Sequence, residues 1–239
     1  MIAVHTFGHL RTVLQCLDGF CEHVLAPLGE YDLFIHTWSE TNRRTPSWYE
    51  VKVDIAPVGE DLVGRVRDRL RPAAMAVDEQ VVDEADERLE YVSALKMHES
   101  IRRGVALRRG MQPAKDYRLV LFTRLDVAFR APVDIAQFAE DVNRPPLERS
   151  VLCISRDHTS WSKSIWMSDR FGGRDVLFFG SQPTMDRFAE IGLDRRIYIR
   201  HPKHERTGEV AFDNFIYSQG LNLQVLNIIS QDDWNVVRE

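Results

Sequence analysis

The sequence lacks the features that define several common protein classes. Its three cysteines, among 239 residues, form no CxxC pair and no even-numbered framework, so a disulfide-stabilised scaffold is excluded. It contains no run of about eighteen apolar residues and no basic N-terminal segment leading into a long apolar one. We therefore expect a cytoplasmic protein without a transmembrane segment, and peripheral attachment at the inner face of a membrane is left open.

Breaks in composition are also absent. No linker rich in Gly, Ser or Pro and no internal repeat divides the chain, which predicts a single domain over residues 1–239. The net charge of −5 offers no general attraction for nucleic acid, so a polyanionic ligand has to meet a local basic site. A hydrophobic content of 44% is ample for a buried core. Cys16 and Cys21 fall in a helical pattern and are expected to be buried free thiols.

The first forty residues predict a β-α-β unit. Residues 2–7 and 31–37 are rich in aliphatic and aromatic side chains, as in buried strands. Between them, apolar residues repeat at helical spacing from Val13 until Pro27 and Gly29 stop the pattern. A crossover of this kind predicts two parallel strands with a right-handed connection.

The alternation continues along the chain. Further strands are expected at residues 52–56, 118–123, 151–155, 175–180 and 223–229, and further helices at residues 61–70, 91–109, 132–142, 183–191 and 209–218. The acidic residues 78–90 are expected to form a solvated helix face or loop. Alternating strands and helices predict an α/β fold, a single Rossmann-like domain with a mostly parallel central sheet flanked by helices.

The strongest functional signal lies where the strand at residues 118–123 ends. Arg124 and Asp126 follow it directly and, as alternate residues, point to the same side. Open α/β sheets bind ligands at the carboxyl ends of their strands, which favours a binding site here. A purely structural Arg–Asp ion pair is the alternative, although burying two charges at the end of an apolar strand costs desolvation energy.

Two other segments are expected at the same edge. Gly8 and Arg11 lie in the turn between the first strand and the first helix, where backbone N–H groups and a guanidinium favour a phosphate. A helix-capping loop with one surface arginine is the alternative. Thr37 and Trp38 end the second strand, where Trp38 either stacks on a base or sugar or caps the sheet core.

The C-terminal half supplies further candidates. The polar segment 161–174, with two tryptophans and two adjacent glycines, suits either a lid over a polar substrate or a plain surface loop. His204 is a candidate remote ligand for a metal ion held by Asp126. Glu209 and Asp213 are spaced i, i+4 on one expected helix face, so either could be a general base. For Glu209, an ordinary carboxylate that complements the helix dipole is the favoured alternative.

Taken in order, these segments resemble bacterial and viral glycosyltransferase-like proteins of capsule and lipopolysaccharide assembly, which have a GT-A-type nucleotide-sugar fold. The resemblance rests on Gly8-His9-Leu10-Arg11, Tyr31-Asp32-Leu33-Phe34-Ile35-His36-Thr37-Trp38, the strand that ends in Arg124-x-Asp126, and Asp175-Val176-Leu177-Phe178-Phe179-Gly180-Ser181 with Met185. It implies a nucleotide-binding half at residues 1–130 and an acceptor and donor-sugar half at residues 131–239. It also implies transfer of a sugar from a nucleotide donor to a glycan or lipid-linked acceptor.

The resemblance also implies roles for individual residues. Arg11 with Thr37 and Trp38 would meet the nucleotide, Arg124 the diphosphate, and Asp126 a metal ion or the donor ribose. Asp175 and Ser181 would face the donor sugar, and Asp213 would be the base. The family's Asp-x-Asp motif holds a divalent cation, Mn²⁺ or Mg²⁺. Here an arginine replaces the first aspartate, which puts metal dependence in doubt and leaves a non-catalytic nucleotide- or glycan-binding domain as the alternative.

Overall fold

A seven-stranded sheet forms the centre of the computed structural model, which describes residues 1–41, 55–83, 92–154, 176–193, 216, 218–226 and 233–237. The strand order is β3-β2-β1-β4-β7-β6-β8. The strands are β1 (Ile2–Phe7), β2 (Tyr31–Trp38), β3 (Ala74–Asp78), β4 (Leu119–Arg124), β6 (Ser150–Ile154), β7 (Leu177–Gly180) and β8 (Asn222–Leu226). β7 pairs antiparallel with both β4 and β6, and the other pairings are parallel. The mostly parallel sheet predicted from the sequence is therefore confirmed.

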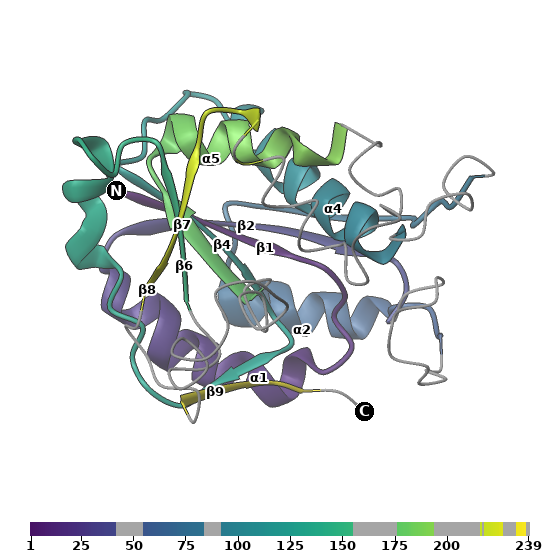
Figure 1. The fold of residues 1–239 in the computed structure, drawn as a ribbon. Coiled ribbons are helices and arrows are strands. Elements are labelled where there is room, and N and C mark those ends of the chain that lie inside the picture. Colours follow the sequence, from purple (N-terminus) through teal and green to yellow (C-terminus); the bar gives the residue numbers. More distant parts are fainter. Residues whose placement is uncertain are drawn as a thin grey trace, which may run out of the picture.

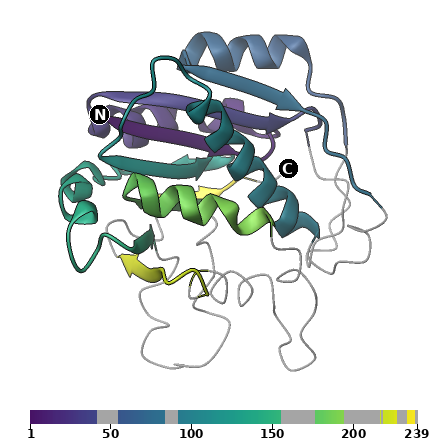
Figure 2. The ribbon, with the colours of Figure 1, turned by 90° about the horizontal axis from the view of Figure 1, so that it is seen from above.

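Helices cover both faces of the sheet (Figures 1 and 2). On one face lie α1 (Val13–Gly19), which continues as a π-helical turn (Phe20–Leu25) and a 3₁₀ turn (Ala26–Leu28), and α2 (Glu60–Leu70). On the other face lie α4 (Val92–Arg109) and α5 (Gln182–Phe188), followed by a 3₁₀ turn (Ala189–Leu193). The result is a three-layer arrangement with one hydrophobic core on each side of the sheet.

The central strands are apolar on both faces, which is why their sequences are continuous hydrophobic runs. All six residues of β1 are buried. Ile2 and Val4 pack into the core beneath α1 and α2, whereas Ala3 and Phe7 pack into the core beneath α4 and α5. This two-sided burial is typical of a parallel strand covered by helices.

The third strand of the sheet was predicted wrongly. Residues 52–54 of the predicted strand lie outside the described residues, and Ile55 and Ala56 are not in a strand. The strand that pairs with β2 is instead β3, which follows α2. β3 is a short edge strand of half-buried residues that includes two alanines, so its own sequence carries little strand signal, and pairing with β2 decides its conformation.

Smaller differences concern the second half of the chain. The helix predicted at residues 132–142 is a pair of 3₁₀ turns (Ala136–Ala139 and Asp141–Asn143). A separate two-stranded sheet pairs β5 (Val127–Phe129) with β9 (Trp234–Val236). All three cysteines are free thiols. Cys16 is buried as predicted, and so is Cys153, but Cys21 is only half-buried. Among the described residues, no helix is long and apolar enough to cross a membrane.

Candidate functional site

The carboxyl ends of the four parallel strands β1 to β4 lie along one edge of the sheet. Phe7 at the end of β1 pairs with Arg124 at the end of β4, and Trp38 at the end of β2 pairs with Asp78 at the end of β3. The loop after β1 begins at Gly8, whose φ of +99° is a conformation that glycine adopts readily. The predicted site segments from β1, β2 and β4 therefore share this edge.

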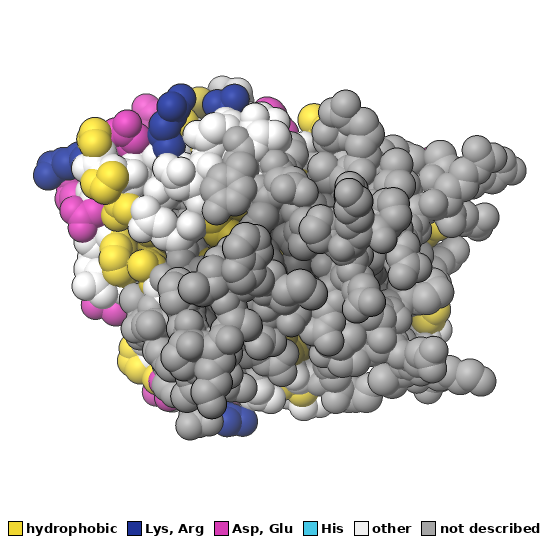
Figure 3. All heavy atoms as spheres, in the orientation of Figure 1, with side chains coloured by type: hydrophobic (Ala, Val, Ile, Leu, Met, Phe, Trp, Pro, Cys, Tyr) yellow, Lys and Arg dark blue, Asp and Glu magenta, His cyan; other side chains and the backbone are white. Residues whose placement is uncertain are grey.

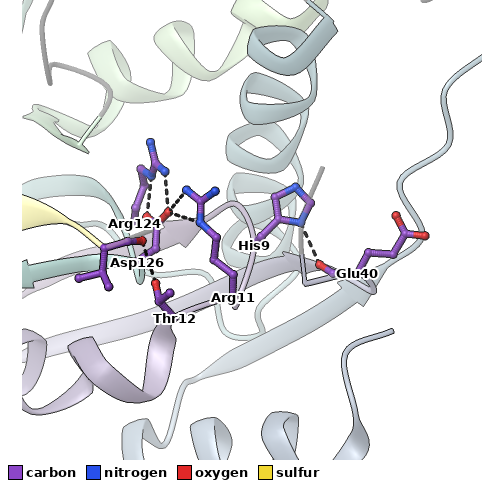
Figure 4. Close-up of polar contacts among 7 residues, drawn as sticks. His9, Arg11, Thr12, Glu40, Arg124 and Asp126 are labelled. Atoms are coloured by element: carbon purple, nitrogen blue, oxygen red, sulfur yellow. Dashed lines mark hydrogen bonds and ion pairs between the residues drawn. The ribbon is translucent and has the colours of Figure 1, made fainter. Parts of the chain in front are cut away.

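The centre of this edge is a cluster of Asp126 with two arginines (Figure 4). Arg124 donates to the carboxylate through Nε to Oδ1 at 2.8 Å and through Nη2 to Oδ2 at 2.6 Å. Arg11, from the loop after β1, donates to Oδ2 through Nε at 3.0 Å and also through Nη2. We call Arg11, Arg124 and Asp126 the arginine cluster. It joins the segments that follow β1 and β4, and Arg11 and Asp126 lie 115 residues apart in sequence.

Within the part of the chain that the structure describes, the arginine cluster holds more positive than negative charge. Burial by itself raises the pKa of Asp126, whose side chain is 4% exposed, but the neighbouring guanidiniums of Arg124 and Arg11 outweigh it and lower this pKa to about 2. The carboxylate is therefore ionised, and among the described residues it faces two guanidiniums. In the described part of the face in Figure 3, basic and acidic side chains are interspersed.

The C-terminal residues hold the arginine cluster in place. The backbone N–H of Val237 donates to the carbonyl of Asp126 at 2.9 Å, and the hydroxyl of Thr12 donates to the carbonyl of Val237 at 3.1 Å. The pairing of β5 with β9 continues this connection. The loops after β1 and β4 are thus fixed to one another through a third segment, which preorganises the two guanidiniums.

A second network lies beside the first and engages the amide of Gly8. This N–H donates to Ser100 Oγ at 3.0 Å, and Ser100 Oγ lies 2.7 Å from His36 Nδ1. His36 Nε2 lies 3.2 Å from Asp78, which also accepts from Arg103 at 2.5 Å. Burial lowers the pKa of His36 to about 4, so the ring is neutral near pH 7. The Gly8 amide predicted to meet a phosphate is already satisfied by this network, which we call the histidine network.

Thr37 and Trp38 are buried rather than presented to a ligand. Each is 1% exposed, and the hydroxyl of Thr37 donates to the carbonyl of Trp38. The Arg103 guanidinium lies 5.0 Å from the centre of the Trp38 ring, a cation–π contact. The structure thus buries Trp38 against Arg103 of α4 and the ring of His36, which agrees with the alternative to stacking on a nucleotide.

Ser181 is placed far from this edge, which corrects its predicted role. Because β7 runs antiparallel to β4, its last residue, Gly180, pairs with Val120 near the beginning of β4. Ser181 follows at the opposite edge, where it is the N-cap of α5 and accepts from the backbone N–H of Thr184 at 3.4 Å. The sequence identified the strand but could not show its direction.

His9 is a site residue that sequence reasoning did not single out. Its ring is half-buried in the loop after β1, and Nδ1 lies 2.9 Å from the backbone carbonyl of Glu40. Burial lowers the pKa of His9 to about 4. Ser100 and Asp78 were also missed, because their importance lies in contacts with distant elements. The only local signal for His9 was its place between a strand end and Arg11.

The structure does not describe the other residues that the sequence predicts for the site. Asp175, His204, Glu209 and Asp213 lie outside the described residues, as does the segment 161–174, so their roles stay predictions.

The described donors around Asp126 do not fit a divalent cation. Both carboxylate oxygens already accept hydrogen bonds from guanidiniums, which repel a cation. Within the described ranges, no group of three His, Cys, Asp or Glu side chains could hold a metal ion. Metal binding by Asp126 together with His204 therefore stays a prediction that these donors do not support.

Comparisons with known proteins add little. No protein-family model and no curated protein matches the chain. A solved structure that carries the name nucleotide-diphospho-sugar transferase, from Desulfovibrio desulfuricans G20, is similar to 97% of this chain over 81% of its own length, with 12% identity and a TM-score of 0.47. At this identity and TM-score, the name of that protein says nothing about the activity of this chain.

Proposed function

We propose that the protein is a glycosyltransferase that moves a sugar from a nucleotide-sugar donor to a glycan or lipid-linked acceptor in surface polysaccharide assembly. The observation that carries this proposal is the arginine cluster. Two guanidiniums converge on one buried carboxylate at the carboxyl edge of the parallel strands, where open α/β sheets bind ligands. Planar guanidiniums that donate two hydrogen bonds each suit a diphosphate.

The chemistry follows from where negative charge develops. When the bond between the sugar and the diphosphate breaks, the diphosphate leaves with additional negative charge. Arg11 and Arg124 are already oriented by Asp126, so they can stabilise that charge with little reorganisation. Among the residues described, Nη1 of Arg11 has no hydrogen-bond partner and is the donor available to a phosphate oxygen.

The base that activates the acceptor hydroxyl is proposed to be Asp213, with Glu209 as second choice and Asp175 beside the donor sugar. We predict that Asp213→Asn lowers the turnover number about a hundredfold or more, a typical general-base contribution, with little change in donor affinity. Steady-state kinetics with donor and acceptor both varied measure this. If Glu209→Gln abolishes turnover and Asp213→Asn does not, the base lies one helical turn away.

A non-catalytic nucleotide- or glycan-binding domain is the second candidate. The occupation of both Asp126 oxygens by arginines favours it, because the position at which the resembling family holds its cation is closed. Hydrolysis of a nucleotide-sugar in the absence of acceptor separates the two candidates. A glycosyltransferase releases the sugar slowly to water, whereas a binding domain leaves the donor intact.

The diphosphate site is tested by calorimetry with UDP, CDP, ADP and GDP and with the matching nucleosides. We expect Arg11→Gln to weaken binding of the diphosphate by about tenfold, in line with hydrogen bonds to charged groups, and to leave nucleoside binding unchanged. Arg103→Gln is the matched control, because Arg103 pairs with Asp78 in the histidine network. Equal losses for both ligands, or no binding of any diphosphate by the wild-type protein, would refute the diphosphate site.

A further inference from the structure

The arrangement of His9 shows which of its two ring nitrogens carries the proton. Nδ1 lies 2.9 Å from the carbonyl oxygen of Glu40. A carbonyl oxygen can only accept a hydrogen bond, so Nδ1 must donate and therefore carries a hydrogen. In a neutral imidazole, Nε2 then has a lone pair and no hydrogen. The backbone at the end of β2 thus sets the tautomer of a side chain in the loop after β1.

The ring is neutral near pH 7. Burial lowers the pKa of His9 to about 4, since the loss of water outweighs the hydrogen bond to Glu40. The nearby guanidiniums of Arg11 and Arg124 also disfavour a second positive charge, and the carboxylate of Asp126 only partly offsets them. His9 therefore presents a hydrogen-bond acceptor next to a group of cationic donors.

This acceptor is available to a ligand. Nε2 of His9 has no hydrogen-bond partner within the part of the chain that the structure describes. In Figure 4 the ring lies between Arg11 and Glu40, with Nε2 turned away from Glu40. A molecule whose phosphate contacts Arg11 would bring its neighbouring atoms to this nitrogen. An ionised phosphate has no hydrogen to donate, so the matching group is a donor beside the phosphate, and in a nucleotide-sugar the nearest such donors are sugar hydroxyls.

We propose that Nε2 of His9 accepts a hydrogen bond from a sugar hydroxyl of the phosphorylated ligand that the arginine cluster holds, and so determines specificity. This inference rests on the proposed function, because it needs a phosphate on Arg11 and Arg124. It divides recognition between two kinds of group: the arginines bind the phosphate charge, and His9 binds a hydroxyl beside it. The hydroxyl belongs either to the ribose of the nucleotide or to the transferred sugar.

Two substitutions separate the acceptor role from the structural one. His9→Asn keeps an amide N–H that can reach the carbonyl of Glu40 but removes the acceptor at the Nε2 position. His9→Gln places an amide oxygen near that position. The probes are pyrophosphate, whichever of UDP, CDP, ADP and GDP binds the wild-type protein most tightly, its 2′-deoxy counterpart, and a nucleotide-sugar with the same base.

We expect His9→Asn to weaken binding of the nucleoside diphosphate or the nucleotide-sugar by about three- to tenfold, the effect of one hydrogen bond. Pyrophosphate binding should stay unchanged, and His9→Gln should restore most of the loss. If the 2′-hydroxyl of the ribose is the partner, the 2′-deoxy ligand loses the same factor with the wild-type protein and nothing further with His9→Asn. If the 3′-hydroxyl is the partner, the nucleoside diphosphate and its 2′-deoxy counterpart lose the same factor with His9→Asn. If only the nucleotide-sugar is affected, the hydroxyl is that of the transferred sugar.

Other outcomes overturn the inference. An equal loss for pyrophosphate would show that His9 contacts phosphate as an imidazolium. Unchanged affinity for every probe would make the residue structural. If His9→Asn does not fold, ¹⁵N NMR of the wild-type ring decides: ligand binding must shift Nε2 while the Nδ1–H tautomer is kept. If the wild-type protein binds pyrophosphate but the His9 results differ from those expected, only this inference fails and the proposed function stands. If the wild-type protein binds no phosphorylated probe, both fail.

Discussion

The two polar clusters at the carboxyl edge of the sheet contain similar residues and have different electrostatic characters. In the arginine cluster, one carboxylate with a 4% exposed side chain faces two guanidiniums. In the histidine network, the Asp78 side chain is 38% exposed and meets one guanidinium and a neutral histidine. Counting only the described side chains, the first cluster has one cation more than it has carboxylates, and the second is electrically balanced.

This difference explains why only one of them suits a ligand. The balanced network satisfies its own donors and acceptors and fixes the Gly8 loop to α4 through Ser100. In the arginine cluster the buried Asp126 is neutralised, and Nη1 of Arg11 has no hydrogen-bond partner among the described residues, so it can meet an anion. An Arg–Asp contact by itself therefore does not identify a binding site. A binding site is indicated by the number of cations around each carboxylate and by how far water screens these charges.

The largest expected difference between the clusters is in stability. Asp126→Asn removes the buried carboxylate that pairs with two guanidiniums and should lower the free energy of unfolding by about 3–5 kcal/mol. Asp78→Asn removes a half-exposed, solvent-screened partner and should lower it by about 1 kcal/mol or less. Urea denaturation of both variants measures this. Equal losses would show that burial does not separate the two clusters.

The clusters should also lose stability at different pH. The pKa of His36 is lowered to about 4 in the folded protein. The contribution of its neutral ring to stability is therefore complete above the pKa of about 6.5 in the unfolded chain. As the pH falls from 6.5 to 4, about 3 kcal/mol of stability is lost. His5, His9 and His98 also have lowered pKa values, so the comparison is wild type against His36→Gln. Asp126 loses its contribution only below about pH 4.

Urea titrations at pH 7, 5.5 and 4.5 measure this second prediction. The variant should show a smaller loss between the first and last values than the wild-type protein does. If the stability of His36→Gln depends on pH as that of the wild-type protein does, folding does not lower the pKa of His36.

Diphosphate affinity should distinguish the arginines of the two clusters. Lysine cannot make the two-pronged contact that Arg124 makes with Asp126, so Arg124→Lys should weaken diphosphate binding by about tenfold. Arg103→Lys, in the histidine network, should leave it unchanged. Calorimetry with the best-binding nucleoside diphosphate gives both values. A comparable loss in Arg103→Lys would contradict the assignment of the ligand to the arginine cluster.

The smallest effect is expected at the opposite edge of the sheet. Ser181→Ala removes the N-cap of α5 and should cost about 1 kcal/mol of stability. Diphosphate and nucleotide-sugar binding should not change, since Ser181 follows the end of β7 that pairs with Val120. Thermal unfolding and calorimetry report the two quantities separately. A loss of donor affinity would restore Ser181 to the site.

The sequence by itself determined the class of fold and the position of the main charged pair. The continuous apolar runs of β1 and β4 reflect burial on both faces, a local property that periodicity and composition reveal. Arg124 and Asp126 stand directly after such a run, so their place at the sheet edge follows from the strand itself. The α/β class and the mostly parallel sheet were predicted for the same reason.

Only the tertiary structure decided which charges meet. The partner that turns an Arg–Asp pair into a cationic cluster is Arg11, which lies 115 residues away from Asp126. The direction of β7, the identity of β3 and the burial of Trp38 likewise depend on pairing and packing between distant segments. Hydrogen bonds and ion pairs between remote residues leave no periodic pattern in a single sequence, because each member satisfies its own local preferences and the contact exists only after folding.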